Sequence, residues 1–117
     1  FSSGWHSAKY EGGVPEEVPI RTAQKLFPKL GVKYGIAAFL HGHEHQYEHN
    51  KINGVHYINT GGGGQPGSKT EGAAIELGKY GGTRCIVMHY SIITIDGDRA
   101  HYVAKDIHGK VIDEFDL

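Results

Sequence analysis

The chain has 117 residues, a formal net charge of −1 and 38% hydrophobic residues, which suits a single domain with a modest core. A charge so close to neutral gives no nucleic-acid-binding signature, and no apolar run is long enough to be a membrane segment. The single cysteine, Cys85, cannot form an internal disulfide, so the redox compartment stays open. The chain begins at Phe1 without an initiator methionine, and we therefore expect a processed or excised piece.

A helix is the first regular element that the sequence predicts. Pro19 suits the first turn of a helix, where its missing N–H costs nothing. Apolar residues then recur at helical spacing, namely Ile20, Ala23, Phe27 and Leu30. Pro28 is expected to kink this helix or to start a second short turn. Gly31 is expected to end it.

The rest of the chain is predicted to form strands and turns. The apolar run over residues 36–40 predicts a buried strand. Residues 51–60 predict a hairpin around Asn53-Gly54, a pair that favours a type I′ turn, with His56 on the strand surface. A long loop is expected over residues 67–82, which are rich in glycine. A strand over 83–95 then opens an antiparallel meander, whose turns and remaining strands are expected at 96–98, 100–104, 108–109 and 111–115.

The predicted buried strand leads directly into the segment His41-Gly42-His43-Glu44-His45-Gln46-Tyr47-Glu48. Histidines at alternate positions share one face of an extended segment, and Gly42 allows a tight turn between the first two. Neutral imidazole is a common ligand for zinc and iron, and a single histidine rarely holds a metal alone. The glycine run 61–64 would let the backbone pass close to such a site. The sequence therefore predicts a metal site.

Taken in order, these segments resemble the C-terminal half of the calcineurin-like metallophosphoesterases, especially the purple-acid-phosphatase-like branch. Gly42-His43-Glu44-His45, with Tyr47 and Glu48 after it, is similar to the family's Gly-His-x-His motif. Segments 1–6, 53–64 and 106–111 are similar to the stretch after its fourth motif, its hairpin with a glycine loop, and its closing strands. The resemblance implies an α/β (α+β) fold: one main helix and a mostly antiparallel sheet, as the C-terminal half of a four-layer α/β/β/α sandwich. Residues 1–117 would then be part of one catalytic domain.

The resemblance also implies a function, the metal-dependent hydrolysis of a phosphoester by a phosphatase or phosphodiesterase. The dinuclear centre would hold two divalent or trivalent ions, Fe, Zn or Mn, between which imidazole ligands do not discriminate. His43 and His45 would be metal ligands, one to each ion. His6 would be a catalytic residue at the substrate mouth, where it contacts phosphate or protonates the leaving group. Further residues would support the ligands or form the substrate loop, namely His41, Tyr47, Glu48, Gly62 and Gly63.

Several of the family's ligands have no counterpart in this sequence. Its earlier motifs supply an Asp/His pair, a bridging aspartate, an Asn-His pair and a further histidine, whereas the aspartates here all fall in the terminal meander. Two histidines cannot hold two metals tightly, so the isolated chain is expected to lack activity. The expected partner is the missing N-terminal half of the domain or another copy of the chain, because a half-domain exposes sheet edges. The resemblance favours a secreted or periplasmic location.

Two other interpretations stay open. The spacing of Gly35, His41, His43 and Glu48 matches the first cupin motif as far as the glutamate, so His41, His43 and Glu48 could bind a single metal in a small barrel. Alternatively, the chain is a non-catalytic binding module in which the histidines cluster incidentally. The second interpretation predicts that His43→Ala and His45→Ala leave metal affinity unchanged.

Overall fold

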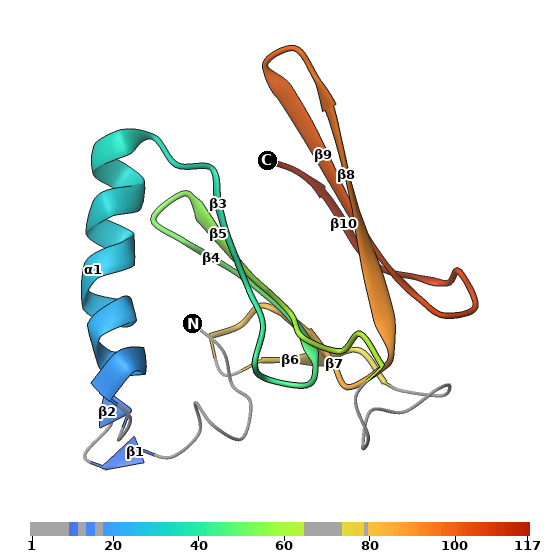
Figure 1. Cartoon of the computed structure of the whole chain (residues 1–117), viewed down its shortest axis with the longest axis horizontal. Coiled ribbons are helices and arrows are strands. Elements are labelled where there is room, and N and C mark those ends of the chain that lie inside the picture. The colour runs from blue at the N-terminus through green and yellow to red at the C-terminus, as the bar shows by residue number, and fades with distance from the viewer. Residues whose placement is uncertain (1–9, 12–13, 16–17, 65–73, 79) are drawn as a thin grey trace.

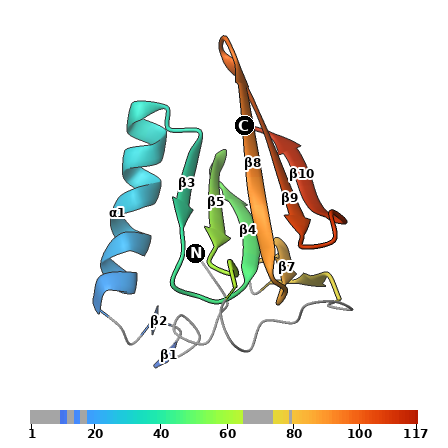
Figure 2. The ribbon, with the colours of Figure 1, turned by 45° about the vertical axis from the view of Figure 1, so that its right-hand side comes forward.

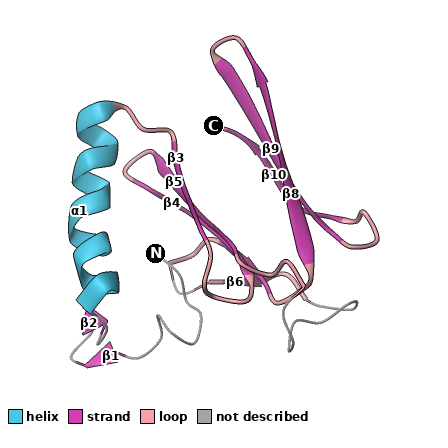
Figure 3. Cartoon of the chain, viewed as in Figure 1, coloured by secondary structure: helices cyan, strands magenta, loops and turns pink. Residues whose placement is uncertain are grey.

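The computed structural model describes residues 10–11, 14–15, 18–64, 74–78 and 80–117 (Figure 1). Its helix is α1 (Val18–Tyr34). Its strands are β1 (Tyr10–Glu11), β2 (Val14–Pro15), β3 (Ala38–His41), β4 (Tyr47–Ile52), β5 (Val55–Thr60), β6 (Glu76–Leu77), β7 (Thr83–Cys85), β8 (His89–Asp96), β9 (Arg99–Asp106) and β10 (Val111–Asp116). Strands thus dominate the described part of the chain (Figure 3).

The predicted helix is present but longer than expected. It runs through Pro28 and ends at Tyr34, so the predicted stop at Gly31 is wrong. A Schellman-type cap closes the helix instead: Gly35 has a φ of 62°, and the N–H of Ile36 donates to the carbonyl of Gly31 over 2.9 Å. Gly31 has a different role, because a Cβ there would lie only 2.8 Å from a methyl group of Val55. The glycine lets α1 lie close to β5.

The central sheet has five strands in the order β3-β5-β4-β7-β6. β3 pairs with β5 in parallel, and the other neighbours are antiparallel. The predicted β4–β5 hairpin is confirmed: Ile52 pairs with Val55, and Asn53 and Gly54 have φ values of 52° and 81°. Both central turn residues thus take the positive φ that a type I′ turn requires. The loop expected over residues 67–82 lies partly outside the described residues, and its described part includes β6.

The C-terminal meander is confirmed as a second, three-stranded antiparallel sheet in the order β10-β9-β8. The single strand expected over residues 83–95 is instead two strands in different sheets. β7 pairs with β4 in the central sheet, whereas β8 pairs with β9 in the C-terminal sheet. The chain crosses between the sheets at residues 86–88, where Val87 inserts its side chain into the core.

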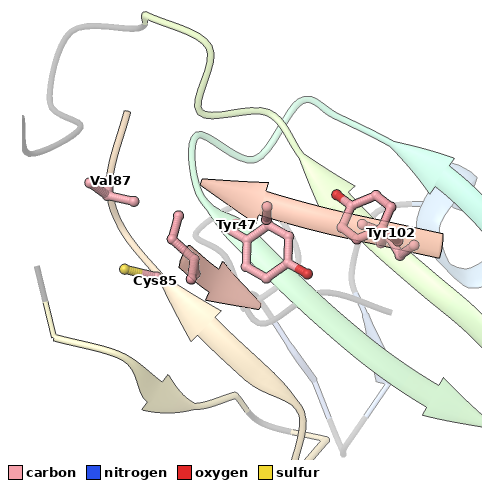
Figure 4. Packing of buried hydrophobic residues seen from close by; sticks show 7 residues of the cluster. Tyr47, Cys85, Val87 and Tyr102 are labelled. Atoms are coloured by element: carbon pink, nitrogen blue, oxygen red, sulfur yellow. The ribbon is translucent and has the colours of Figure 1, made fainter. Parts of the chain in front are cut away.

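Three layers follow one another across the molecule: α1, the five-stranded sheet and the C-terminal sheet (Figures 1 and 2). This arrangement confirms an α+β fold with one helix and mostly antiparallel strands. The core between the two sheets is formed by buried side chains, namely Tyr47, Ile58, Cys85, Val87, Tyr102, Ala104 and Ile112 (Figure 4). On the opposite face of the central sheet, the rings of Phe27, Phe39 and Tyr57 stack in sequence, with centroids 4.9 and 5.5 Å apart. None of the described helical sequence is long and apolar enough to cross a membrane.

Candidate functional site

The histidine motif forms the turn between β3 and β4. His41 is the last residue of β3, and the chain turns back before β4 begins at Tyr47. His43 has a φ of 77°, a left-handed conformation that is uncommon for a residue with a side chain and often marks a functional site. His43 and His45 are exposed, while Glu44 between them is buried. The turn therefore presents two neighbouring imidazoles on the surface.

Asn59, near the end of β5, fixes the backbone of this turn. Its side-chain amide donates to the carbonyl of Glu44 over 2.9 Å and to the carbonyl of Gln46 over 3.0 Å. The N–H of Gln46 also donates to the carbonyl of Glu44 over 2.8 Å. Asn59 is fully buried, so these hydrogen bonds are shielded from water. They tie the backbone on both sides of His45 to the central sheet.

Gly61 completes this support. A Cβ on Gly61 would overlap the carbonyl oxygen of Glu44 and lie 3.4 Å from the amide nitrogen of His43. Only a residue without a side chain lets the two backbones approach so closely. The close backbone approach expected of the glycine run 61–64 is thus present at Gly61. The role of Asn59 was missed, because it depends on strand pairing, which a local pattern does not reveal.

The two glycines expected in the substrate loop lie in different surroundings. Gly62 is buried against the start of the C-terminal sheet, where a Cβ would lie 2.5 Å from Nδ1 of His89 and 2.6 Å from the carbonyl of Val87. Gly63 is exposed, and no described atom lies within 4 Å of its hypothetical Cβ. Gly62 therefore serves the junction of the sheets, whereas Gly63 has room for a ligand beside it.

His41 lies at the edge of a cavity of about 420 Å³ between α1 and the central sheet. Phe27, Phe39 and Tyr57 form an aromatic wall of this cavity, and His43 lines its rim. Within the described residues, Nε2 of His41 is buried without a hydrogen-bond partner. Burial lowers the pKa of His41, which keeps the imidazole neutral. His41 is thus set apart from the two exposed histidines, and the shared face predicted for all three is only partly realised.

Glu48 is held in a buried polar network behind the turn. Its carboxylate accepts hydrogen bonds from the side-chain amides of Gln46, over 2.9 Å, and Asn50, over 3.0 Å. Gln46 in turn accepts from Nε of Arg84 over 3.0 Å, and Arg84 pairs with Glu76 over 3.1 Å. This network joins β4, β7 and β6 at the base of the turn. It gives Glu48 a supporting position rather than a place beside the exposed imidazoles.

Tyr47 points into the core between the sheets, on the opposite face of β4 from Glu48. Its ring lies edge-on to His89 at a centroid distance of 5.4 Å, and its hydroxyl donates to Oδ2 of Asp113 over 2.9 Å. Burial, reinforced by the charge of Asp113, raises the pKa of Tyr47 well above its ordinary value. Tyr47 therefore anchors the first residue of β4 to the C-terminal sheet.

The donor set for a metal is incomplete within the described residues. His43 and His45 fit as imidazole ligands, since both are exposed on a fixed backbone. No group of three histidine, cysteine, aspartate or glutamate side chains in the described ranges could hold a metal ion. His6, expected as a catalytic residue, lies outside those ranges. The described part of the chain thus presents two exposed imidazoles but no complete set of metal ligands.

Comparisons of the chain with protein-family models, with curated proteins and with solved structures found no significant match. The site accordingly rests on the Gly-His-x-His pattern and on the geometry of the turn that carries it.

Proposed function

We propose that this chain supplies the Gly-His-x-His half of a dinuclear metal centre that hydrolyses phosphoesters, as a phosphatase or phosphodiesterase of the metallophosphoesterase type. The observation that carries the proposal is the turn after β3. His43 adopts a left-handed backbone there, and Asn59 and Gly61 hold the turn so that His43 and His45 face solvent. Residues that ligate a metal need such support from the residues around them.

Each residue of the proposed site has a defined role. His43 and His45 bind one metal ion each, and Asn59 sets the distance between them through the carbonyls on either side of His45. Bound Fe, Zn or Mn ions would supply positive charge that polarises the phosphoryl group. His6 contacts the phosphate or protonates the leaving group. Gly63 leaves space for the substrate beside the turn.

The remaining ligands come from outside the described residues in this proposal. The described layers then correspond to three layers of a four-layer α/β/β/α sandwich, which the N-terminal half of the domain or a second copy completes. The parallel pairing of β3 with β5 supports this, since parallel strands are normally found in sheets extended by further strands and covered on both faces. Among the described strands, β3 is at one edge of the central sheet, and it lines the cavity under α1.

Zinc titration of the 117-residue chain by calorimetry tests the proposed ligands. We expect weak binding that falls by at least about tenfold in His43→Ala and in His45→Ala, equivalent to about 1.4 kcal/mol for each lost ligand. His108→Ala, at an exposed histidine of the meander, should bind zinc like the wild type. Unchanged affinity in both ligand variants would contradict the proposal and favour a non-catalytic binding module.

An activity assay separates the half-site from a complete enzyme. We expect no turnover of p-nitrophenyl phosphate by the isolated chain with Zn, Mn or Fe, because two imidazoles do not hold two metal ions. Metal-dependent turnover that disappears in His43→Ala would show that the chain holds the whole centre. The claim that this chain supplies only half of the centre would then be wrong.

The cupin interpretation is weaker in this geometry. It requires His41, His43 and Glu48 to converge on one metal, yet Glu48 is fully buried and bonded to the amides of Gln46 and Asn50. The described strands also form open sheets rather than a closed barrel.

A further inference from the structure

A chain of side-chain contacts connects the two sheets at a distance from the proposed metal loop. Oδ2 of Asp113 on β10 accepts from Nδ1 of His49 on β4 over 2.9 Å. Nε2 of His49 lies 2.8 Å from Nδ1 of His56 on β5. The ring of Phe115 stacks on both imidazoles, with centroids 3.8 Å from His49 and 4.9 Å from His56. We call Asp113, His49, His56 and Phe115 the histidine seam.

The seam is largely closed to solvent. The side chains of His49 and Asp113 are 14% and 16% exposed, and His56 is 5% exposed. We expected His56 on the strand surface, and this was wrong, because the C-terminal sheet covers that face of β5 through Phe115. Two imidazoles that share one hydrogen bond and are largely closed to solvent have only a few compatible protonation states.

Counting protons identifies those states. Asp113 accepts from Nδ1–H of His49, so a neutral His49 must use Nε2 as an acceptor for Nδ1–H of His56. One added proton is tolerated, since one imidazolium can donate to the other, neutral ring. A second added proton places two N–H groups and two positive charges face to face at 2.8 Å, which breaks the hydrogen bond and repels the rings.

Both a carboxylate and a cation lie close to the imidazole pair. The charged and titratable groups around the pair, within the described residues, are Asp113 on β10, Tyr47 and Lys51 on β4, and Tyr102 on β9. Burial opposes ionisation of Asp113, but hydrogen bonds from His49 and Tyr47 outweigh it and hold the pKa of this carboxyl below its usual value. Burial, helped by Lys51 and His49, lowers the pKa of His56.

We propose that the histidine seam is an acid-sensitive contact that holds the central and C-terminal sheets together. It stays closed while the imidazole pair carries at most one added proton and opens when both rings are protonated. An exposed histidine has a pKa of about 6.5, so the open form gains protons below that pH and is favoured progressively under mildly acidic conditions. The inference requires neither a metal nor phosphatase activity, so it stands or falls apart from the proposed function.

Nuclear magnetic resonance of the 117-residue chain between pH 7.5 and 5 tests whether this contact opens on protonation. Imidazole ¹⁵N shifts report the charge of each ring, and nuclear Overhauser effects from Phe115 to His49 and His56 report closure. We expect these effects at pH 7.5 and their joint loss as the second imidazole becomes charged. The contact between Phe27 and Phe39 beneath α1 should persist, which separates opening from global unfolding.

Variants assign the transition to the seam. His56→Phe keeps an aromatic ring but removes one charge, so its His49–Phe115 contact should survive at a pH at least about one unit lower, a tenfold change in proton concentration. If this variant does not fold, His49→Gln keeps a donor for Asp113 without the charge and should retain the His56–Phe115 contact in the same way. Asp113→Asn should open at higher pH, because the charge that stabilises the first proton is lost.

The matched control is His101→Gln, which removes an exposed histidine on β9 that lies outside the seam. It should open at the wild-type pH. Contacts that persist in the wild type after both rings are charged would overturn the proposal. The proposal would also be overturned if the Phe27–Phe39 contact and the seam were lost at the same pH, and if that pH were the same in the wild type and in His56→Phe.

Discussion

Asn59 is the residue that most directly fixes the backbone of the turn that carries His43 and His45, the proposed metal ligands. Its amide makes two hydrogen bonds to backbone carbonyls, both buried. The exchange Asn59→Asp keeps the size of the side chain but replaces the two donor hydrogens with an acceptor. We expect the free energy of unfolding in urea to fall by about 2–4 kcal/mol, because buried carbonyls lose donors and face a carboxylate. Zinc affinity should fall as well, since the spacing of His43 and His45 is no longer fixed.

The same chemical change at an exposed position provides the control. Asn53→Asp alters the β4–β5 turn, where aspartate also tolerates a positive φ. Its unfolding free energy should stay within about 0.5 kcal/mol of the wild type. Equal stability of the two variants would mean that Asn59 does not hold the turn.

At the level of single residues, the sequence singled out the histidine pair and the nearby glycine run but not Asn59, which holds the turn. Gly-His-x-His after an apolar run is a local pattern, and it singled out His43 and His45, which the structure places exposed between β3 and β4. Asn59 and Gly61 reach that turn only because β5 lies between β3 and β4. Such an arrangement depends on strand order, which a reading of neighbouring residues does not supply.

Gly31 shows how packing between elements reverses a helix preference. In an isolated helix, replacing glycine with alanine stabilises by about 1 kcal/mol. Here the new Cβ would lie 2.8 Å from a methyl of Val55, a buried β-branched residue with few alternative rotamers. Overpacking typically costs about 1–3 kcal/mol. We therefore expect Gly31→Ala to lower the free energy of unfolding in urea, by up to about 2 kcal/mol after the helix gain is subtracted.

Val32→Ala is the matched control for this prediction. Val32 is 61% exposed on the same helix, so the substitution should raise the free energy of unfolding by about 0.5 kcal/mol through helix propensity alone. If Gly31→Ala stabilised the chain as Val32→Ala does, the close approach of α1 to β5 would be contradicted.

Among the elements, those with a strong local signal were predicted correctly. Asn53-Gly54 fixed the hairpin, and the turns at residues 96–98 and 108–109 defined the meander. The end of α1 was misplaced because Gly31, an ordinary stop signal, is needed for contact with β5. The break at residues 86–88 was also missed, since a β-rich run does not reveal that its two halves join different sheets.

Across the whole molecule, buried histidines make stability depend on pH. Burial lowers the pKa of His89, although its contact with the carbonyl of Val87 opposes this. Below pH 6.5 the unfolded chain therefore binds more protons at this residue than the folded chain does. The contribution of His89 to the free energy of unfolding is complete above that pH and is lost as the pH falls toward the folded pKa. The slope is at most about 1.4 kcal/mol per pH unit for one proton.

His101 acts in the opposite direction. Hydrogen bonds to Asp116 and Glu114 raise its pKa, so its contribution is complete below pH 6.5 and is lost as the pH rises through the folded pKa. Urea unfolding at pH 7.5, 6.5 and 5.5 should show that the free energy of unfolding of the wild type decreases as the pH is lowered. The decrease should be smaller in His89→Gln and larger in His101→Gln. A reversed order of the two variants would contradict these assignments. Salt should weaken the effect of His101, which is exposed.

The most direct test of the proposed metal site is the response of individual imidazoles to zinc. Side-chain ¹⁵N resonances of the 117-residue chain, followed during a zinc titration at neutral pH, identify the ligands without an activity assay. We predict that His43 and His45 shift together at the same zinc concentration, while His41, His49 and His101 stay in place. Joint shifts of His41 and His43, with loss of the Gln46–Glu48 hydrogen bond, would instead establish the single-metal site of the cupin interpretation and contradict the phosphoesterase proposal.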